Sequence, residues 1–222
     1  MKDALLEPCL FGYWRSSAAY RVRIALNLKA IAASQVPVQL QAGEQKSADY
    51  RALNPAGLVP LWREPDGFTL AQSLAIIEYL DEKFPDPPLL PDDFRQKALC
   101  REIAYTIACD IHPAGNLRVL EKLTADYGAG PEARAAWNRH WIAAGFDAIE
   151  TRLAAMAGRH AIGDRISLAD ICLVPQVYNA LRVGLDLAPY SRITAADAAA
   201  RKLPAFMAAA PEAQAPGTLP KG

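Results

Sequence analysis

The chain has 222 residues, of which 52% are hydrophobic and 22% are charged, so its composition argues against wholesale disorder. Lys and Arg together number 24, as do Asp and Glu, so the formal net charge is zero. This balance argues against a general nucleic-acid binder or a protein that coats anionic membranes, and no apolar stretch is long enough to span a bilayer.

The first part of the chain predicts an alternation of short strands and helices. The predicted strands cover residues 9–13, 36–41, 59–62 and 68–71. A Pro-Asp-Gly turn joins the last two as a hairpin. Apolar residues at helical spacing predict a helix after the first strand, and residues 73–84 predict another, with Ser73 as its N-cap. This order is typical of a mixed α/β domain.

A proline-rich stretch follows, which cannot continue the helix before it because proline lacks the amide donor. Strand signals end at this stretch. The segments that predict helices beyond it are 95–111, 133–156, 167–183 and 195–210. The third has a clear start, with Ser167 as N-cap and Asp170 three residues later. We therefore expect an α/β domain over residues 1–86, a linker at 87–93 and an all-helical domain over 94–222.

The cysteines and histidines indicate neither disulfides nor a metal site. The four cysteines are widely spaced and form no CxxC pair, which is typical of free thiols in a reducing cytosol. The three histidines have no metal-ligand partners at useful spacing. The N-terminus carries Asp3 and Glu7 and lacks an uninterrupted apolar core, so we expect no secretory leader and a cytoplasmic protein.

The helix after the first strand has an unusual distribution of charge. Its start carries the hydroxyls of Ser16 and Ser17, and we expect its first turn to carry Arg21 and Arg23. A helix N-terminus is already the positive end of the macrodipole, so added cations there favour a negatively charged ligand or a thiolate. The alternative is that one serine merely caps the helix and the arginines pair with surface carboxylates.

Motifs along nearly the whole chain resemble the zeta class of glutathione transferases, the family of maleylacetoacetate and maleylpyruvate isomerases. The matching segments are YWRSSAAYRVRIALNLK, GEQKSADYRALNPAGLVP, QSLAIIEYLDEKFP, IACDIHPAGNLRVL, RHWIAAGFDAIE and DRISLADICLVPQVYNALR. The resemblance implies the glutathione transferase fold, in which a thioredoxin-like N-terminal domain precedes an all-α C-terminal domain. It also implies a homodimer with glutathione as cofactor.

In the first domain, the resemblance implies that Ser16 donates a hydrogen bond to the glutathione sulfur, with Ser17 as its neighbour. The other implied contacts are Gln45 with the glycine end, the Val59 backbone with the cysteinyl amide, and Gln72 and Ser73 with the γ-glutamyl carboxylate. It further implies a cis peptide bond before Pro60. The alternatives are that Ser73 is only an N-cap and that Gln45 is only a loop amide.

In the helical domain, the positions implied to lie over the thiol are His112, Asn116, Arg118 and Arg182. His112 and Asn116 are four residues apart and would share a face of one helix. The two arginines suit the substrate's carboxylate and its developing oxyanion, because a guanidinium binds oxyanions bidentately. The alternatives are a structural histidine and a solvated surface arginine.

The implied activity is the glutathione-dependent cis–trans isomerisation of maleylpyruvate or maleylacetoacetate, an acidic cis-enone, in the catabolism of aromatic compounds. Ala18 stands where the maleylacetoacetate isomerase pattern has Cys, and Tyr20 where it has Trp. The nucleophile therefore has to come from glutathione, and this form is more similar to bacterial maleylpyruvate isomerases. Two other functions remain open: a transferase that conjugates or dehalogenates small α-haloacids, and a non-catalytic glutathione-binding protein.

Overall fold

The computed structural model describes residues 7–156 and 158–215. Residues 1–6, which hold most of the segment for which we expect no secretory leader, lie outside these ranges. The chain forms two compact units. The first contains the described residues up to Pro88 together with 204–215, and the second contains those from Leu89 to Leu203.

The first unit is built on a four-stranded sheet in the order β2-β1-β3-β4. The strands are β1 (Cys9–Gly12), β2 (Ser34–Pro37), β3 (Leu61–Arg63) and β4 (Thr69–Ala71). β1 pairs in parallel with β2, whereas β3 is antiparallel to both β1 and β4. The strand predicted at 36–41 instead ends at Pro37, because the chain then turns through η1 (Leu40–Ala42) and η2 (Glu44–Lys46).

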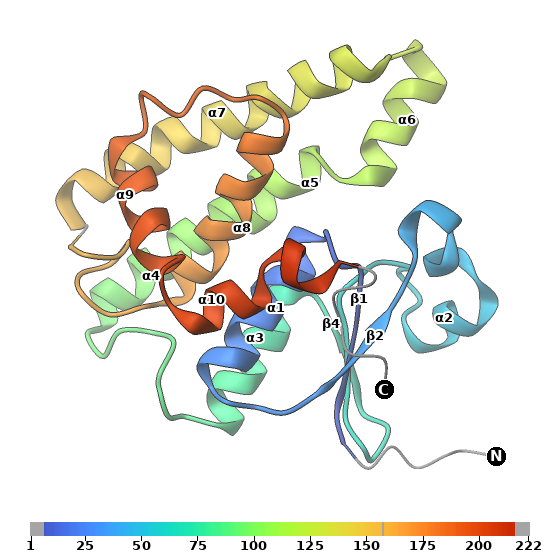
Figure 1. Cartoon of the computed structure of the whole chain (residues 1–222), viewed down its shortest axis with the longest axis horizontal. Coiled ribbons are helices and arrows are strands. Elements are labelled where there is room, and N and C mark those ends of the chain that lie inside the picture. Colours follow the sequence, from blue (N-terminus) through green and yellow to red (C-terminus); the bar gives the residue numbers. More distant parts are fainter. Residues whose placement is uncertain (1–6, 157, 216–222) are drawn as a thin grey trace. The chain divides into compact units, whose positions relative to one another are not determined.

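Three helices pack with this sheet: α1 (Ser17–Leu28), α2 (Ala48–Leu53) and α3 (Ser73–Lys83). Figure 1 shows α1 and α3 on one side of the sheet and α2 on the other. The core on the α1 and α3 side consists of large apolar side chains that are fully buried, among them Leu10, Ile24, Trp62, Ile76 and Leu80. Burying them removes apolar surface from water, which is the main stabilising term for such a unit.

The C-terminal segment belongs to the first unit and not to the helical one. We expected one helix over 195–210, but the structure has α9 (Ser191–Ala200) and a separate α10 (Pro204–Ala209). The break precedes Pro204, whose ring cannot continue the helix before it. α10 then packs on α1, where the amide of Asn27 donates to the Ala205 carbonyl at 2.9 Å. This tertiary contact could not be predicted from the proline alone.

The second unit is all-helical. Its elements are α4 (Phe94–Tyr105), the π-helix η3 (Thr106–Ile111), α5 (His112–Ala114), α6 (Leu117–Tyr127), α7 (Pro131–Met156), α8 (Leu168–Arg182) and α9. Most residues of α8 are buried, and α4 and α9 both pack on it. Among the helices of the described residues, none has the length and apolar character needed to cross a bilayer.

The start of α8 confirms the capping prediction. The Ser167 backbone and hydroxyl both donate to Asp170 Oδ2, at 2.9 and 3.0 Å, and the two residues form a capping box. The other carboxylate oxygen of Asp170 accepts from the Ala161 amide at 2.8 Å. The motif therefore satisfies buried amides on both the helix and the loop before it. α6, in contrast, was not predicted.

Candidate glutathione-binding site

The sheet register brings several predicted site segments to one end of the first unit. Phe11 near the end of β1 pairs with Leu61 at the start of β3, and Leu61 pairs with Ala71 at the end of β4. The turn before α1, the segment that leads into β3 and the start of α3 therefore all meet at this end. Residues that contribute to these three segments include Ser16, Ser17, Val59, Gln72 and Ser73.

Ser16 is the N-cap of α1. Its backbone is extended, and its hydroxyl oxygen accepts from the Ala19 amide at 3.2 Å. The described residues offer no acceptor to the hydroxyl proton, which is thus available to donate outward. Ser16 is half-buried whereas Ser17 is buried, so Ser16 is the more accessible of the two hydroxyls.

α3 begins differently from its prediction. Its N-cap is Gln72, and Ser73 is its first helical residue. Gln72 is exposed and has φ of +73°, a conformation that a residue with a side chain rarely adopts. The Gln72 side chain makes no capping hydrogen bond to α3. Strained backbone of this kind is found disproportionately at ligand-binding positions.

Arg21 and Arg23 lie in the interior of α1, not in its first turn, and both are buried. Arg21 Nη1 donates to Ser73 Oγ at 3.3 Å. Arg23 donates to the carbonyls of Trp14 and Ala209, each at 3.0 Å. These hydrogen bonds join α1 to α3 and to α10.

The side-chain amide of Gln45 and the backbone of Val59 both have hydrogen-bonding groups without a partner in the described residues. Gln45 lies in η2 and is 6% exposed; its Nε2 donates to the Leu40 carbonyl at 3.4 Å. Its Oε1 is buried with no hydrogen-bond partner in the described residues. The peptide bond between Val59 and Pro60 is cis, as the resemblance implies, and the Val59 backbone has no hydrogen-bond partner within the described ranges.

His112 and Asn116 do not share a helix face, which corrects our expectation. α5 ends at Ala114, and Asn116 is the N-cap of α6, where its Oδ1 accepts from the Arg118 amide at 3.2 Å. The physical reason is that Asn competes well for a helix N-terminus and Gly115 closes the helix before it. Arg118 is exposed in the first turn of α6.

Arg182 lies far along the chain from Arg118, at the last residue of α8. It is exposed, and its Nη1 donates to Asn179 Oδ1 at 3.2 Å. An arginine in the last turn of a helix also interacts favourably with the negative end of the macrodipole. The side chain therefore stabilises the end of α8.

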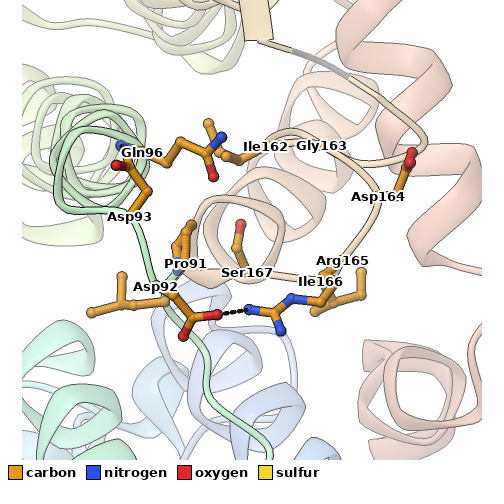
Figure 2. Close-up of a pocket in the computed structure, with 11 residues that line it drawn as sticks. Pro91, Asp92, Asp93, Gln96, Ile162, Gly163, Asp164, Arg165, Ile166 and Ser167 are labelled. Atoms are coloured by element: carbon orange, nitrogen blue, oxygen red, sulfur yellow. Dashed lines mark hydrogen bonds and ion pairs between the residues drawn. The ribbon is translucent and has the colours of Figure 1, made fainter.

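A cavity of about 360 Å³ lies in the second unit, and none of the predicted site residues lines it. It is lined by residues 90–93, Gln96 and 162–167. Figure 2 shows Asp92 and Arg165 pointing toward one another across its edge, and their side chains form an ion pair at 3.3 Å. In the described part of the chain no cluster of three or more His, Cys, Asp or Glu side chains could hold a metal ion.

Sequence reasoning missed the hydrogen bond between Arg21 and Ser73. The available signal was a pair of arginines on an otherwise apolar helix, which we interpreted as facing a ligand directly. Burial requires that each guanidinium find acceptors inside the protein, since an unpaired buried charge is costly. That requirement predicts partners but not their identity.

Comparisons with known proteins show which family this chain resembles. Residues 15–83 match the family model described as the N-terminal domain of glutathione S-transferase. A probable maleylacetoacetate isomerase from Vibrio cholerae is 49% identical over 212 residues, which cover 95% of this chain and 98% of that protein. These matches include the serine-bearing turn and both α1 and α3.

Two solved structures are similar over the whole fold. The holo structure of a maleylpyruvate isomerase, a bacterial zeta-class glutathione transferase, has a TM-score of 0.90 and 45% identity, and covers 95% of this chain and 99% of its own. A maleylacetoacetate isomerase from Anaeromyxobacter dehalogenans, with dicarboxyethyl glutathione and citrate bound, has a TM-score of 0.85 and 41% identity. It covers 96% of this chain and 98% of its own. The predicted glutathione transferase fold is confirmed.

Proposed function

Since the chain belongs to the maleylacetoacetate and maleylpyruvate isomerase family of zeta-class glutathione transferases, we propose that it is a glutathione-dependent cis–trans isomerase of an acidic cis-enone. The substrates proposed are maleylpyruvate or maleylacetoacetate, formed in the catabolism of aromatic compounds. The observation that carries the proposal is the half-buried hydroxyl of Ser16 at the N-cap of α1, with a proton to donate. A helix N-terminus with a hydroxyl donor is suited to hold a thiolate.

The donor set at this end of the sheet fits a tripeptide with charged ends. The buried Oε1 of Gln45 lacks a partner and can accept from a peptide amide near the glycine end. The Val59 backbone, at the entry to β3, can pair with the cysteinyl amide as a short extra strand does. Gln72 and Ser73, at the start of α3, would hold the γ-glutamyl carboxylate.

Glutathione, when bound, supplies a thiolate that adds reversibly to the double bond and so allows rotation about it. The Ser16 hydroxyl donates to the sulfur and favours its ionised form, with Ser17 as the neighbouring hydroxyl at the helix start. Ala18 contributes no thiol, so this chain's turn stabilises a nucleophile and does not provide one.

Arg118 and Arg182 are proposed to bind the acidic substrate. Both are exposed and permanently charged, and a guanidinium suits a carboxylate and a developing oxyanion. His112 and Asn116, at the junction of α5 and α6, are proposed to contribute to the glutathione side of the site. The dicarboxyethyl glutathione and citrate bound in the active site of the Anaeromyxobacter relative support an acidic substrate.

The proposal extends to assembly and location. We propose a homodimer, on the family resemblance, and a mass measurement in solution tests it. We also propose that the protein acts in the cytoplasm. Cys9, Cys100 and Cys109 are free thiols, which fits a reducing compartment.

The test is the isomerisation of maleylpyruvate and of maleylacetoacetate, followed by ultraviolet absorbance with catalytic and with no glutathione. We expect turnover that requires glutathione and leaves its concentration unchanged. Conjugation of an α-haloacid with stoichiometric loss of glutathione, and no isomerisation, would replace the proposal by a transferase. Glutathione binding without either reaction would leave a non-catalytic binding protein.

A further inference from the structure

Arg21 lies directly behind the proposed γ-glutamyl position. Its side chain is 1% exposed and extends from α1 to the start of α3, where Nη1 donates to Ser73 Oγ at 3.3 Å. Ser73 itself is 6% exposed and is the first residue of α3. A permanent positive charge is therefore buried in contact with a hydroxyl at the positive end of a helix.

The chemistry of this contact dictates the direction of the Ser73 hydroxyl. A guanidinium carries only donors, so Ser73 has to accept from Arg21 and its own proton has to point elsewhere. The described residues offer that proton no acceptor. The hydroxyl is thus prepared to donate to a ligand, and its donation is strengthened because Arg21 withdraws electron density from the same oxygen.

The charge distribution at this position selects the ligand. The Arg21 charge and the free amides at the start of α3 add, since both are positive. Gln72, which is exposed and has φ of +73°, makes the turn between β4 at the edge of the sheet and the first residue of α3. Such a position favours a carboxylate over a neutral group.

We propose that Arg21 is a positioning residue for the γ-glutamyl carboxylate of glutathione. It orients the Ser73 hydroxyl as a donor and supplies the buried charge that makes this end of the tripeptide specific for an anion. The inference rests on the proposed function, because it assigns Arg21 to the glutathione site that function requires.

The test compares two peptides on the full-length protein: glutathione and γ-aminobutyryl-cysteinylglycine, which lacks only the γ-glutamyl carboxylate. We expect the wild-type protein to bind glutathione more tightly by calorimetry. Arg21→Met should weaken glutathione binding about tenfold and leave the shorter peptide almost unaffected, because the orientation of the Ser73 hydroxyl and the buried charge matter only to the peptide that carries the carboxylate. The KM for glutathione should rise in parallel, with kcat at saturating glutathione retained.

Two further variants keep the test decisive. Arg21→Lys retains the charge and is less disruptive to folding; it should lose part of the discrimination between the peptides. Arg23→Met removes the other buried guanidinium of α1, which donates to the carbonyls of Trp14 and Ala209 and not to Ser73, and should leave the ratio of the two affinities unchanged. It is the matched control for general damage to the helix.

The outcomes separate the two proposals. If Arg21→Met and Arg21→Lys both bind the two peptides with the wild-type affinity ratio, Arg21 does not act on the carboxylate and the inference is wrong. If the wild-type protein binds neither peptide, the proposed function fails first and the inference fails with it. Loss of discrimination in Arg23→Met equal to that in Arg21→Met would also overturn the specific role of Arg21.

Discussion

Arg23 Nε donates to the Ala209 carbonyl at 3.0 Å and joins the middle of α1 to the last residue of α10. Its Nη2 donates to the Trp14 carbonyl, also at 3.0 Å, in the turn that leads to Ser16. One buried guanidinium therefore holds the C-terminal helix and the serine-bearing turn at once. Burial lowers the pKa of Arg23 to about 10, so the side chain remains charged at neutral pH.

Arg23→Met should destabilise the protein by about 3 kcal/mol, since two charge-assisted hydrogen bonds are lost and two carbonyls lose their donor. Urea unfolding measures this change, and hydrogen exchange should show faster exchange in residues 204–215. Asn27→Ala is the matched control: Asn27 is exposed and donates to Ala205 on the same helix, so its loss should cost about 1 kcal/mol or less. Equal costs for the two variants would contradict the anchoring role.

Ser16→Ala should lower kcat about 100-fold, the usual scale for removing one donor from a developing anion. The thiol pKa of bound glutathione, titrated by the ultraviolet absorbance of the thiolate, should rise because a hydrogen bond to the ionised sulfur is lost. Ser17→Ala, at the buried neighbour, is the comparison and should have a smaller effect on both quantities. A larger effect of Ser17→Ala would reassign the thiolate to Ser17.

Arg182→Met should raise the KM for the acidic substrate about tenfold, with the affinity for glutathione unchanged, because one charge-assisted contact to a carboxylate is lost. Steady-state kinetics and calorimetry on one preparation separate the two quantities. Arg192→Met removes another exposed arginine, one that pairs with Glu150 at 3.5 Å and has no proposed part in the site. Wild-type kinetics in Arg182→Met would show that Arg182 serves only the end of α8.

Asp197 should make stability depend on pH. Burial raises its pKa to about 6, and its Oδ1 has no hydrogen-bond partner in the described residues, while Arg201 lies 3.7 Å from Oδ2. A raised carboxyl pKa means that the folded state holds the proton more tightly. Its contribution to stability is complete below the ordinary pKa and is lost as the pH rises through about 6.

Asp197→Asn should therefore be more stable than the wild type at neutral pH by about 3 kcal/mol, with the difference vanishing near about pH 4. Denaturant unfolding of both proteins across this range measures the difference and cancels the titration of other groups. A difference independent of pH would mean that Asp197 titrates normally.

The sequence by itself determined the features that depend on neighbours a few residues apart. Ser16 is the N-cap of α1, and Ser167 and Asp170 form the capping box of α8, because a cap satisfies amides two or three residues away. The β3–β4 hairpin also followed from its turn residues. The capping prediction at Ser73 was wrong by one residue, since the exposed Gln72 adopts a positive φ that no local pattern required.

Only the tertiary structure decided the partners of the buried charges. Arg21 reaches Ser73 across 52 residues, and Arg23 reaches Ala209 across 186. The composition of α1 shows two cations among apolar residues, but a buried guanidinium bonds to whichever acceptor the packing of distant elements brings near. The same applies to α10, whose place in the first unit depends on side chains of α1. Local propensity thus specified where the helices begin, and long-range packing specified what their charges do.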